Sequence, residues 1–443
     1  MLSVLYVASL SLAHLAITMA NRLNELLRSS YNPYNHSSPG VRSGGWEGSG
    51  GSRVSSRASR GNSRSICSEV SVLTVGDPLM DVVIQVDDAF LTEKGLTRGG
   101  CLPCDLQDAE LLVDEAKKAC GTDISLRPGG SAANVARMMA RLGGSVAVKF
   151  VGSCGDDDMG EAYRKSMEAE GVCAEGVVAT DSYDTGRCVC LVEELNGERT
   201  MRSFLGASSA LDASAVASAA PGITMCHLEG YALWRDGLTA ACAKAAIENA
   251  GRPCVLSLDL ASHELVTRRF DELRQVLDGG HFDVIFCNEE EALALDACLS
   301  GSDAGVDDDD DDDDLDRDAA IMRALDYLSA SCSTFANVSL GARGCLVASQ
   351  RHGVQSTFIE GITVRHVVDT VGCGDAYAAG VLWALAQGAH PVCAARIGQA
   401  CGAATASSVG ATVMDDGGLQ MLQWTVDAYL AQGGSLLQPS TTL

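Results

Sequence analysis

Short, mainly apolar runs alternate with alanine-rich stretches of helical periodicity from Val70 onward. The runs lack a regular polar position at every second residue, which is typical of strands buried on both faces. They predict strands over Val70–Val75, Val146–Val151, Val255–Leu258, Val284–Phe286 and Ala336–Leu340. Helices are predicted between them, including Ala132–Leu142, Gly237–Ala250 and Ala319–Ser329. This alternation indicates an α/β fold with a mostly parallel central sheet, helices on both faces, and ligands at the carboxyl ends of the strands.

Two segments interrupt the alternation. Val82–Val86 follows the first strand without a helix between them, and Thr185–Phe204 predicts a hairpin that turns at Asn196-Gly197. We expect these segments to form a small antiparallel sheet that projects from the main domain as a lid, over about residues 81–125 and 185–205.

The ends of the chain and one insertion differ in composition from the predicted domain, which we place at residues 67–430. Residues 28–64 are rich in Ser, Gly and Arg, which suits an organellar transit peptide, with a secretory signal or a later start as alternatives. Residues 1–66 are interpreted as a disordered or targeting segment, and residues 431–443 as a flexible tail. The eight consecutive aspartates at 307–314 repel one another, which predicts a disordered surface insertion over about residues 300–317.

Composition narrows the possible functions. A net charge of −26 argues against binding to nucleic acid or to an anionic membrane, and residues 2–18 are too short and too interrupted to predict a membrane span. Many of the 18 cysteines lie in apolar runs, where a free thiol behaves as a small hydrophobe. The single CxxC, Cys101–Cys104, has no second pair and no helix start after it, so neither a metal nor a redox role is predicted for it. We expect a reducing intracellular location, which is a plastid or other organelle if residues 1–66 are a transit peptide and the cytoplasm otherwise.

The stretch RPGGSAANVARMMARLGG, residues 127–144, predicts a loop and an amphipathic helix. Ser131 is the expected N-cap, and Arg137 and Arg141 are expected to point away from the apolar face. That face consists of Ala132, Val135, Met138, Met139 and Leu142. A purely structural role explains this much. Gly129 and Gly130, which let a ligand approach the backbone, and Asn134, which can hold a hydroxyl, also suit an acceptor-binding loop.

The stretch DTVGCGDAYAAG, residues 369–380, places two glycines and an aspartate immediately before an apolar helix. The backbone N–H groups of residues 372–375 would lie at the helix N-terminus, where unpaired donors and the helix dipole favour an anion. Asp375 is either an acid that compensates the dipole or a base beside a phosphate. The chain contains no Walker-type phosphate loop and no glycine-rich turn after its first strand, which argues against a Rossmann-type dehydrogenase.

Two further stretches carry polar residues after predicted strands. FCNEEEAL, residues 286–293, offers Asn288 and Glu291 either as helix-start residues or as ligands that hold Mg²⁺ against nucleotide phosphates. SLGARGCLV, residues 339–347, offers Gly341 and Gly344 in a turn on which a nucleotide can lie.

Together and in this order, these four stretches resemble the signatures of the PfkB carbohydrate kinase family, whose ribokinase-like fold includes adenosine kinases. The resemblance covers about residues 70–412. It implies a mostly parallel sheet with a small β-sheet lid, ATP and Mg²⁺ as cofactors, and in many members a monovalent cation such as K⁺. It also implies a small-molecule sugar or nucleoside as the partner, without nucleic acid or stable membrane insertion, and a homodimer that pairs through the lid.

The resemblance also implies residue roles. Asp375 would be the catalytic base, and Gly372, Cys373 and Gly374 the anion hole. Glu291 would organise Mg²⁺ through water, together with Asn288. The acceptor would be bound by Asp81, Gly129, Gly130 and Asn134. The nucleotide would be lined by Ser339, Gly341 and Gly344 and by the helix around residues 400–408, and the monovalent cation by Asp369, Val371 and Gly410.

Three departures from the family pattern bear on function. Cys373 replaces a small alanine, which we expect to be tolerated because the backbone N–H carries the function, although the thiol adds a site for oxidation. Val371 replaces a frequent Thr or Asn at the cation loop. The long stretch from Lys94 to Ser125 enlarges the lid. The expected activity is the transfer of the ATP γ-phosphoryl group to a primary hydroxyl. The sequence GDPLMDVVIQVDDAFL resembles adenosine-kinase-like members, while a sugar acceptor and a catalytically inactive scaffold or regulatory protein in an organelle remain alternatives.

Overall fold

The computed structural model describes residues 70–96, 98–144, 146–193, 199–301, 313–364, 367 and 369–407. Within these residues, nine strands form a large sheet in the order β14-β13-β12-β11-β10-β9-β1-β5-β6. Neighbours from β12 to β6 are parallel, and β13 and β14 add an antiparallel edge. The strands are β1 Val70–Val75, β5 Val146–Gly155, β6 Cys173–Thr180, β9 Met225–Glu229, β10 Val255–Asp259, β11 Val284–Asn288, β12 Phe335–Ser339, β13 Gly344–Ser349 and β14 Val354–Glu360. The predicted mostly parallel sheet is therefore confirmed.

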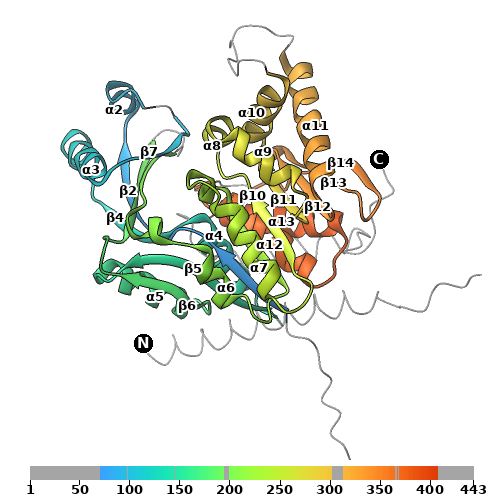
Figure 1. Ribbon diagram of the computed structural model, residues 1–443. Helices are drawn as coiled ribbons and strands as arrows, with labels where there is room; N and C mark the ends of the chain where they lie inside the picture. Colours follow the sequence, from blue (N-terminus) through green and yellow to red (C-terminus); the bar gives the residue numbers. More distant parts are fainter. Residues whose placement is uncertain are drawn as a thin grey trace, which may run out of the picture.

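Helices cover both faces of the large sheet (Figure 1). One face is packed against α4 Ser131–Leu142, α5 Asp158–Ala169, α12 Cys373–Ala386 and α13 Pro391–Thr405. The other is packed against α6 Ala213–Ala219, α7 Leu238–Asn249, α8 His263–Arg268, α9 Phe270–Asp278, α10 Glu289–Ser300 and α11 Asp313–Ser331. Helix α11 begins inside the segment expected to be disordered. Arg317 anchors its first turn by donating to Glu289 of α10 at 2.8 Å, and residues 302–312 lie outside the described part of the chain.

A second, five-stranded sheet has the order β3-β8-β7-β2-β4 in the described residues, and we call it the small sheet. Its strands are β2 Leu79–Val86, β3 Cys101–Pro103, β4 Ser125–Gly129, β7 Gly186–Glu193 and β8 Arg199–Phe204. The predicted hairpin is present as the antiparallel pair β7–β8, and its predicted turn at Asn196-Gly197 lies outside the described residues. The sheet is not purely antiparallel as expected, because β2 pairs with β7 and β3 with β8 in parallel.

The two faces of the small sheet have different surroundings. Helices α2 Asp88–Glu93 and α3 Leu106–Cys120 pack on one face through apolar side chains such as Ile84, Phe90 and Leu191. Helix α3 begins two residues after Cys104, with Asp105 as its N-cap, so the expectation that no helix follows the CxxC was wrong. The other face carries Leu79, Cys188 and Cys190.

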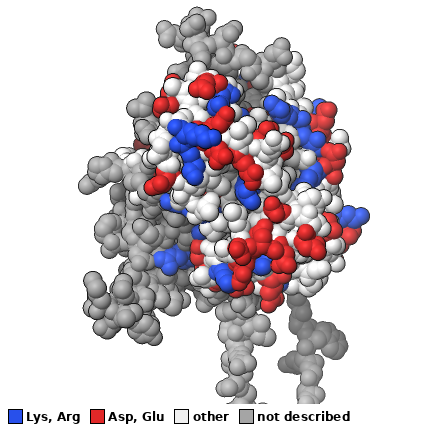
Figure 2. Space-filling model, turned by 90° about the vertical axis from the view of Figure 1, so that its left-hand side faces the viewer, with Lys and Arg blue, Asp and Glu red and all other residues white. Residues whose placement is uncertain are grey.

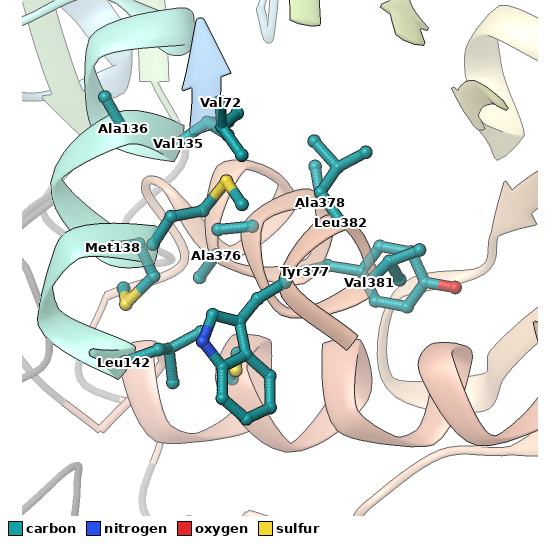
Figure 3. Packing of buried hydrophobic residues seen from close by; sticks show 14 of the residues in the cluster. Val72, Val135, Ala136, Met138, Leu142, Ala376, Tyr377, Ala378, Val381 and Leu382 are labelled. Carbon is teal, nitrogen blue, oxygen red and sulfur yellow. The ribbon is translucent and has the colours of Figure 1, made fainter. Parts of the chain in front are cut away.

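Helix α4 packs directly on helix α12 (Figure 3). All five residues of the predicted apolar face of α4 are buried, and Val135, Met138 and Leu142 point toward α12 in Figure 3. Trp383 of α12 adds a hydrogen bond from its Nε1 to the carbonyl of Gly143 at 2.9 Å. This packing holds the first turns of α4 and α12 side by side.

Arg137 is buried, contrary to the expectation that it points away from the core side of α4. Its guanidinium donates through Nε and Nη2 to the carboxylate of Glu170, at 2.7 Å each, and through Nη1 to the carbonyl of Pro128 at 3.1 Å. A buried guanidinium is tolerated because its donors are paired in this way.

The charged surface and the burial of several cysteines are as expected from the amino-acid composition. On the face shown in Figure 2, acidic and basic side chains are interspersed, and acidic ones gather in its lower half. The described part of the chain contains no helix long and apolar enough to cross a membrane. Its cysteines are all free thiols, and Cys226, Cys287, Cys345 and Cys401 are buried in apolar surroundings.

Candidate active site

The carboxyl ends of the parallel strands and the small sheet enclose a cavity of about 310 Å³. Asp77 follows β1, and the last residues of β9 to β12 are Glu229, Asp259, Asn288 and Ser339. All five line the cavity, together with residues from α4, α12 and the cavity-facing side of the small sheet. The position agrees with the expectation that ligands bind where parallel strands end.

Asp375 lies in the first turn of α12, and its side chain contacts the first turn of α4. Its Oδ1 accepts a hydrogen bond from the Ser131 hydroxyl at 2.7 Å, and its Oδ2 accepts one from Nδ2 of Asn134 at 2.8 Å. Burial raises the pKa of the Asp375 carboxyl, whereas the bonds from Asn134 and Ser131 lower it. The carboxylate is therefore held in one orientation, with a basicity above that of an exposed aspartate.

The start of α12 also offers backbone donors. Gly372 is the N-cap with φ 70°, and the N–H of Cys373 already donates to the carbonyl of Thr370 at 3.2 Å. Because first-turn N–H groups have no acceptor within their own helix, the donors of Gly374 and Asp375 are the ones available to an anion. Gly372 and Gly374 line the cavity, and a Cβ at Gly374 would meet no heavy atom within 4 Å, so an oxyanion has room to approach.

Cys373 was expected to form the anion hole with Gly372 and Gly374, but its N–H donates to Thr370 and the residue does not line the cavity. Its Sγ lies 4.0 Å from the carbonyl oxygen of Asp369, and burial raises the pKa of the thiol to about 12. A thiol held protonated in this way reacts slowly with oxidants, so the structure argues against the sensitivity expected from the sequence.

Glu229 determines how α4 begins, a role that local sequence did not reveal. Its Oε2 accepts from the N–H of Ala132 at 2.8 Å, and its Oε1 accepts from the N–H of Asp77 at 2.7 Å. The N-cap of α4 is Gly130, with φ 96°, and not Ser131 as predicted. Because a carboxylate from β9 supplies the cap, the Ser131 hydroxyl is free to bind Asp375.

Asp81 on β2 lies against the loop that precedes α4. A Cβ on Gly129 would stand 2.2 Å from its Oδ1, so only glycine fits there, and a Cβ on Gly130 would meet the Asp77 carbonyl oxygen at 2.3 Å. Burial raises the pKa of Asp81 to about 7. The glycines thus permit the close approach that places the Asp81 carboxyl in the cavity wall.

The Gly129→Ala substitution is expected to displace the Asp81 carboxyl and to raise the KM for the acceptor about 10- to 100-fold, the loss expected for one or two hydrogen bonds to hydroxyls. The KM for ATP should stay unchanged. Steady-state kinetics with each substrate varied in turn measures both constants. Leu126→Ala on the exposed face of the same strand is the matched control, and equal effects of the two substitutions would contradict the role given to Gly129.

Asn288 and Glu291 form a capping box at the start of α10. Asn288 Oδ1 accepts from the N–H of Glu291 at 2.9 Å, and the Glu291 carboxylate accepts from the N–H and Nδ2 of Asn288 at 2.9 and 2.6 Å. Burial, and after it the nearby carboxylate of Asp259, raises the pKa of Glu291 well above its usual range. Burial raises the pKa of Asp259 to about 7. The carboxyls of buried Glu291 and half-buried Asp259 and an amide oxygen are a donor set that suits Mg²⁺, which would favour the charged forms of both carboxyls.

Two arginines balance the acids of the site. Arg235 donates to both carboxylate oxygens of Asp77, at 2.8 and 3.1 Å. Arg199 of β8 pairs with Asp369 at 2.6 Å, and the side chains of this pair are 8% and 10% exposed.

The expected cation loop begins at Asp369. The second carboxylate oxygen of Asp369 accepts a hydrogen bond from the N–H of Val371 at 3.0 Å. The Asp369 carboxylate is thus occupied, so a cation at this loop would take carbonyl oxygens. Gly410, the third expected cation ligand, lies outside the described residues.

The predicted nucleotide residues divide into two groups. Ser339 lines the cavity, whereas Gly341 and Gly344 lie in the turn between β12 and β13, beyond the cavity lining. A Cβ on Gly344 would stand 2.0 Å from the carbonyl oxygen of Ile359, so this glycine is required for the close approach of β14. Gly341 has φ 56° and open space around it.

Sequence reasoning missed a largely apolar wall at the end of the cavity beside the small sheet. It consists of Leu102, Pro103, Met201, Leu205, Tyr231 and Trp234. The only local signal was the aromatic pair in GYALW, which forms a short 3₁₀ turn after β9. These side chains come from β3, β8 and two connections, so only the folded chain brings them together.

Comparisons with known proteins agree with this geometry. The family model of the pfkB family carbohydrate kinases matches residues 102–416. An adenosine kinase of Schizophyllum commune is 26% identical over 331 residues, which are 72% of this chain and 90% of that protein. An ATP-dependent ribose-1-phosphate kinase of Halopiger xanaduensis is 29% identical over 320 residues, 69% of this chain and 90% of that protein. The crystal structure of adenosine kinase from Sinorhizobium meliloti superposes with a TM-score of 0.67 at 27% identity, over 80% of this chain and 99% of that one. The resemblance seen in the motifs is confirmed.

Proposed function

Because the chain belongs to the pfkB family of carbohydrate kinases, we propose that it transfers the γ-phosphoryl group of ATP to a primary hydroxyl of a nucleoside. Family membership implies ATP as the phosphate donor and, as a rule, Mg²⁺. The choice of a nucleoside over a free sugar rests on one observation, the apolar and aromatic wall at the acceptor end of the cavity.

A nucleoside has a polar sugar and a flat, less polar base. The acceptor end of the cavity likewise has a polar side and an apolar side. Asp81 and Asn134 offer polar groups to ribose hydroxyls, while Met201, Leu205 and Trp234 offer a surface for a planar base. A free hexose carries hydroxyls around its ring, and those facing this wall would lose their hydrogen bonds to water without replacement. Aromatic side chains hold bases of any kind by stacking, so the wall favours the class of nucleosides rather than one base.

In the proposed reaction the acceptor hydroxyl lies beside Asp375, which takes its proton as the oxygen attacks the γ-phosphorus. The N–H groups of Gly374 and Asp375 face the charge that develops on the phosphoryl oxygens. Ser131 and Asn134 keep the carboxylate oriented throughout. Asn288 and Glu291 would hold Mg²⁺, which would neutralise charge on the phosphates. Positioning and electrostatics thus account for catalysis, since phosphoryl transfer requires no covalent intermediate.

Two finer features complete the proposal. A monovalent cation binds to carbonyl oxygens of the loop around Val371, next to the helix start that receives the phosphate. Two copies of the chain pair through their small sheets, whose outer parts expose Leu126 on the edge strand β4 and Leu111 on α3.

The experiment that tests this function is an assay of ADP release from Mg·ATP by the purified full chain. The acceptor panel contains adenosine, guanosine, cytidine, uridine, ribose and fructose. The proposal expects turnover with at least one nucleoside at a kcat/KM that exceeds those of ribose and fructose. Turnover only with a free sugar would contradict the choice of acceptor, and no turnover with any acceptor would favour the inactive scaffold.

Removal of the indole at the apolar wall is expected to weaken nucleoside binding selectively. The Trp234→Leu substitution should raise the KM for the nucleoside about 10- to 100-fold, because a stacking contact is worth roughly 1–3 kcal/mol. Tyr183→Leu, which removes an exposed aromatic side chain between β6 and β7, is the control and should leave the KM unchanged. Kinetics with the nucleoside varied at saturating ATP measures the effect, and an unchanged KM in Trp234→Leu would place the base elsewhere.

A further inference from the structure

The cavity-facing side of the small sheet carries two thiols and a carboxylate close together. Asp81 of β2 is in register with Cys188 of the parallel neighbour β7, and Cys190 follows on the same face of β7 because alternate residues of a strand share a face. One carboxylate oxygen and the two sulfurs lie within 4.8 Å of one another. The sulfurs of Cys188 and Cys190 are 3.7 Å apart. All three side chains line the cavity.

The separation of the two sulfurs matches that of a tetrahedral metal site. With Zn–S bonds of about 2.3 Å, two sulfur ligands at tetrahedral angles lie about 3.8 Å apart. A carboxylate oxygen binds Zn²⁺ at about 2.0–2.2 Å, and the Asp81 carboxylate, within 4.8 Å of both sulfurs, is placed to supply the third ligand. Three protein ligands leave the fourth position open toward the cavity, where a water molecule can occupy it.

The same geometry argues against a disulfide between Cys188 and Cys190. Residues two apart on one strand are separated by about 6.6–6.8 Å, and their Cβ atoms diverge little from this distance. A disulfide needs Cβ atoms about 3.5–4.5 Å apart. Strand β7 is hydrogen-bonded on both sides, to β2 and to β8, so it resists the required distortion.

We propose that Asp81, Cys188 and Cys190 bind one Zn²⁺, and that the bound ion closes the acceptor end of the cavity. Each thiol gives up its proton when the metal–sulfur bond forms. Thiolate ligands select Zn²⁺ over Mg²⁺, whereas the oxygen donors around Asn288 and Glu291 suit Mg²⁺. The cavity thus holds two cation sites of different chemistry. Closure of the acceptor end rests on the proposed function, whereas metal binding itself does not.

The charges around the cluster are compatible with a cation. Arg199 lines the same cavity, and its charge is countered by Asp369 at 2.6 Å. Ser203 of β8 places its hydroxyl 3.4 Å from the sulfur of Cys188, where it can donate to a thiolate. Gly129 has no side chain and so leaves room for the Asp81 carboxyl beside it. The site therefore has ligands, a second layer of contacts and an opening to solvent.

Binding is tested on the full chain, free of metal and nucleotide, by titration with Co²⁺ and then with Zn²⁺. One equivalent of Co²⁺ should give the thiolate-to-cobalt charge-transfer band and the strong visible bands of a tetrahedral complex, and Zn²⁺ should remove them. The Cys188→Ser/Cys190→Ser variant should lose these bands and bind this equivalent at least about 100-fold more weakly. Cys173→Ser, an exposed thiol on β6, is the control and should retain both signals. Co²⁺ bound by the aspartates at 307–314 would give no thiolate-to-cobalt band, so the spectrum distinguishes that binding from binding at the proposed site.

Asp81→Asn provides a second variant that keeps both thiols and the side-chain volume. It should retain a sulfur band while the affinity falls at least about 10-fold. Far-ultraviolet circular dichroism checks that each variant is folded. A wild-type titration without a sulfur band, or an unchanged band in the double cysteine variant, overturns the site.

Inhibition kinetics tests the closure of the acceptor end. Zn²⁺ should inhibit competitively with the acceptor and not with Mg·ATP, and a zinc-selective chelator should restore the rate. Inhibition competitive with Mg·ATP would overturn the closure while leaving the spectroscopic site intact. A protein that shows the sulfur band but turns over no acceptor would contradict the proposed function and not the metal site.

Discussion

The Asp375→Asn substitution is expected to lower kcat about 10²- to 10⁴-fold, the usual contribution of a general base, while the affinity for ATP stays the same. Asparagine has nearly the shape of aspartate and keeps one oxygen that accepts from Ser131 or Asn134, so the first turns of α4 and α12 should remain in place. Single-turnover measurement of ADP formation, with nucleotide binding measured separately, distinguishes chemistry from binding. An unchanged kcat would show that Asp375 is only the acid that compensates the helix dipole.

The pH profile of the wild type provides a second measurement on the same group. A general base is active when deprotonated, so kcat/KM falls as the pH drops through its pKa. Because burial raises the pKa of Asp375, this loss should occur at higher pH than for an ordinary aspartate. The hydrogen bond from Asn134 lowers that pKa, so Asn134→Ala should move the acid limb to still higher pH. A limb that does not move would contradict the coupling between Asn134 and the base.

The sequence predicted the parts of the site whose signal is local. Each predicted strand is present, and Asp375, Gly372 and Gly374 are recognisable because the turn, the helix start and the carboxylate lie in one short stretch. Ser339 lies near the end of a predicted strand and Glu291 follows another, and both line the cavity. Local patterns suffice where the chemistry needs neighbouring residues.

The remaining parts depend on strand order, which one sequence does not specify. Glu229 and Asp259 end β9 and β10, but only the fold brings Glu229 to the start of α4 and Asp259 near Glu291. The prediction that Ser131 caps α4 was wrong. The N–H of Ala132 in the first turn is bound instead by the carboxylate of Glu229, which lies 97 residues away in the chain. The small sheet was expected to be antiparallel because hairpins are local, whereas the parallel pairing of β2 with β7 requires the chain to return after adding β5 and β6 to the large sheet.

Glu229 is expected to have the largest effect on stability among the residues of the site. The Glu229→Leu substitution leaves the N–H groups of Asp77 and Ala132 buried without acceptors, which costs about 2–6 kcal/mol in the free energy of unfolding. Glu229→Gln keeps one accepting oxygen and should lose about half as much. Glu175→Ala, at an exposed position of β6, should change the free energy by less than about 0.5 kcal/mol. Denaturant unfolding of the three variants measures these values.

The stability of the wild type should also depend on pH through Glu229. Burial, and after it the nearby Asp77 carboxylate, raises the pKa of Glu229 to about 8, above the value of about 4.3 for an unfolded glutamate. The folded state therefore binds a proton more tightly than the unfolded state, so this contribution to stability is complete below the unfolded pKa and is lost as the pH rises toward 8. Glutamine does not titrate, and Glu229→Gln should make the decline between pH 5 and pH 8 shallower. An equal decline in both proteins would show that other buried acids of the cavity, such as Asp81 and Asp259, cause it. A stability that rises with pH over this range would contradict the raised pKa of Glu229.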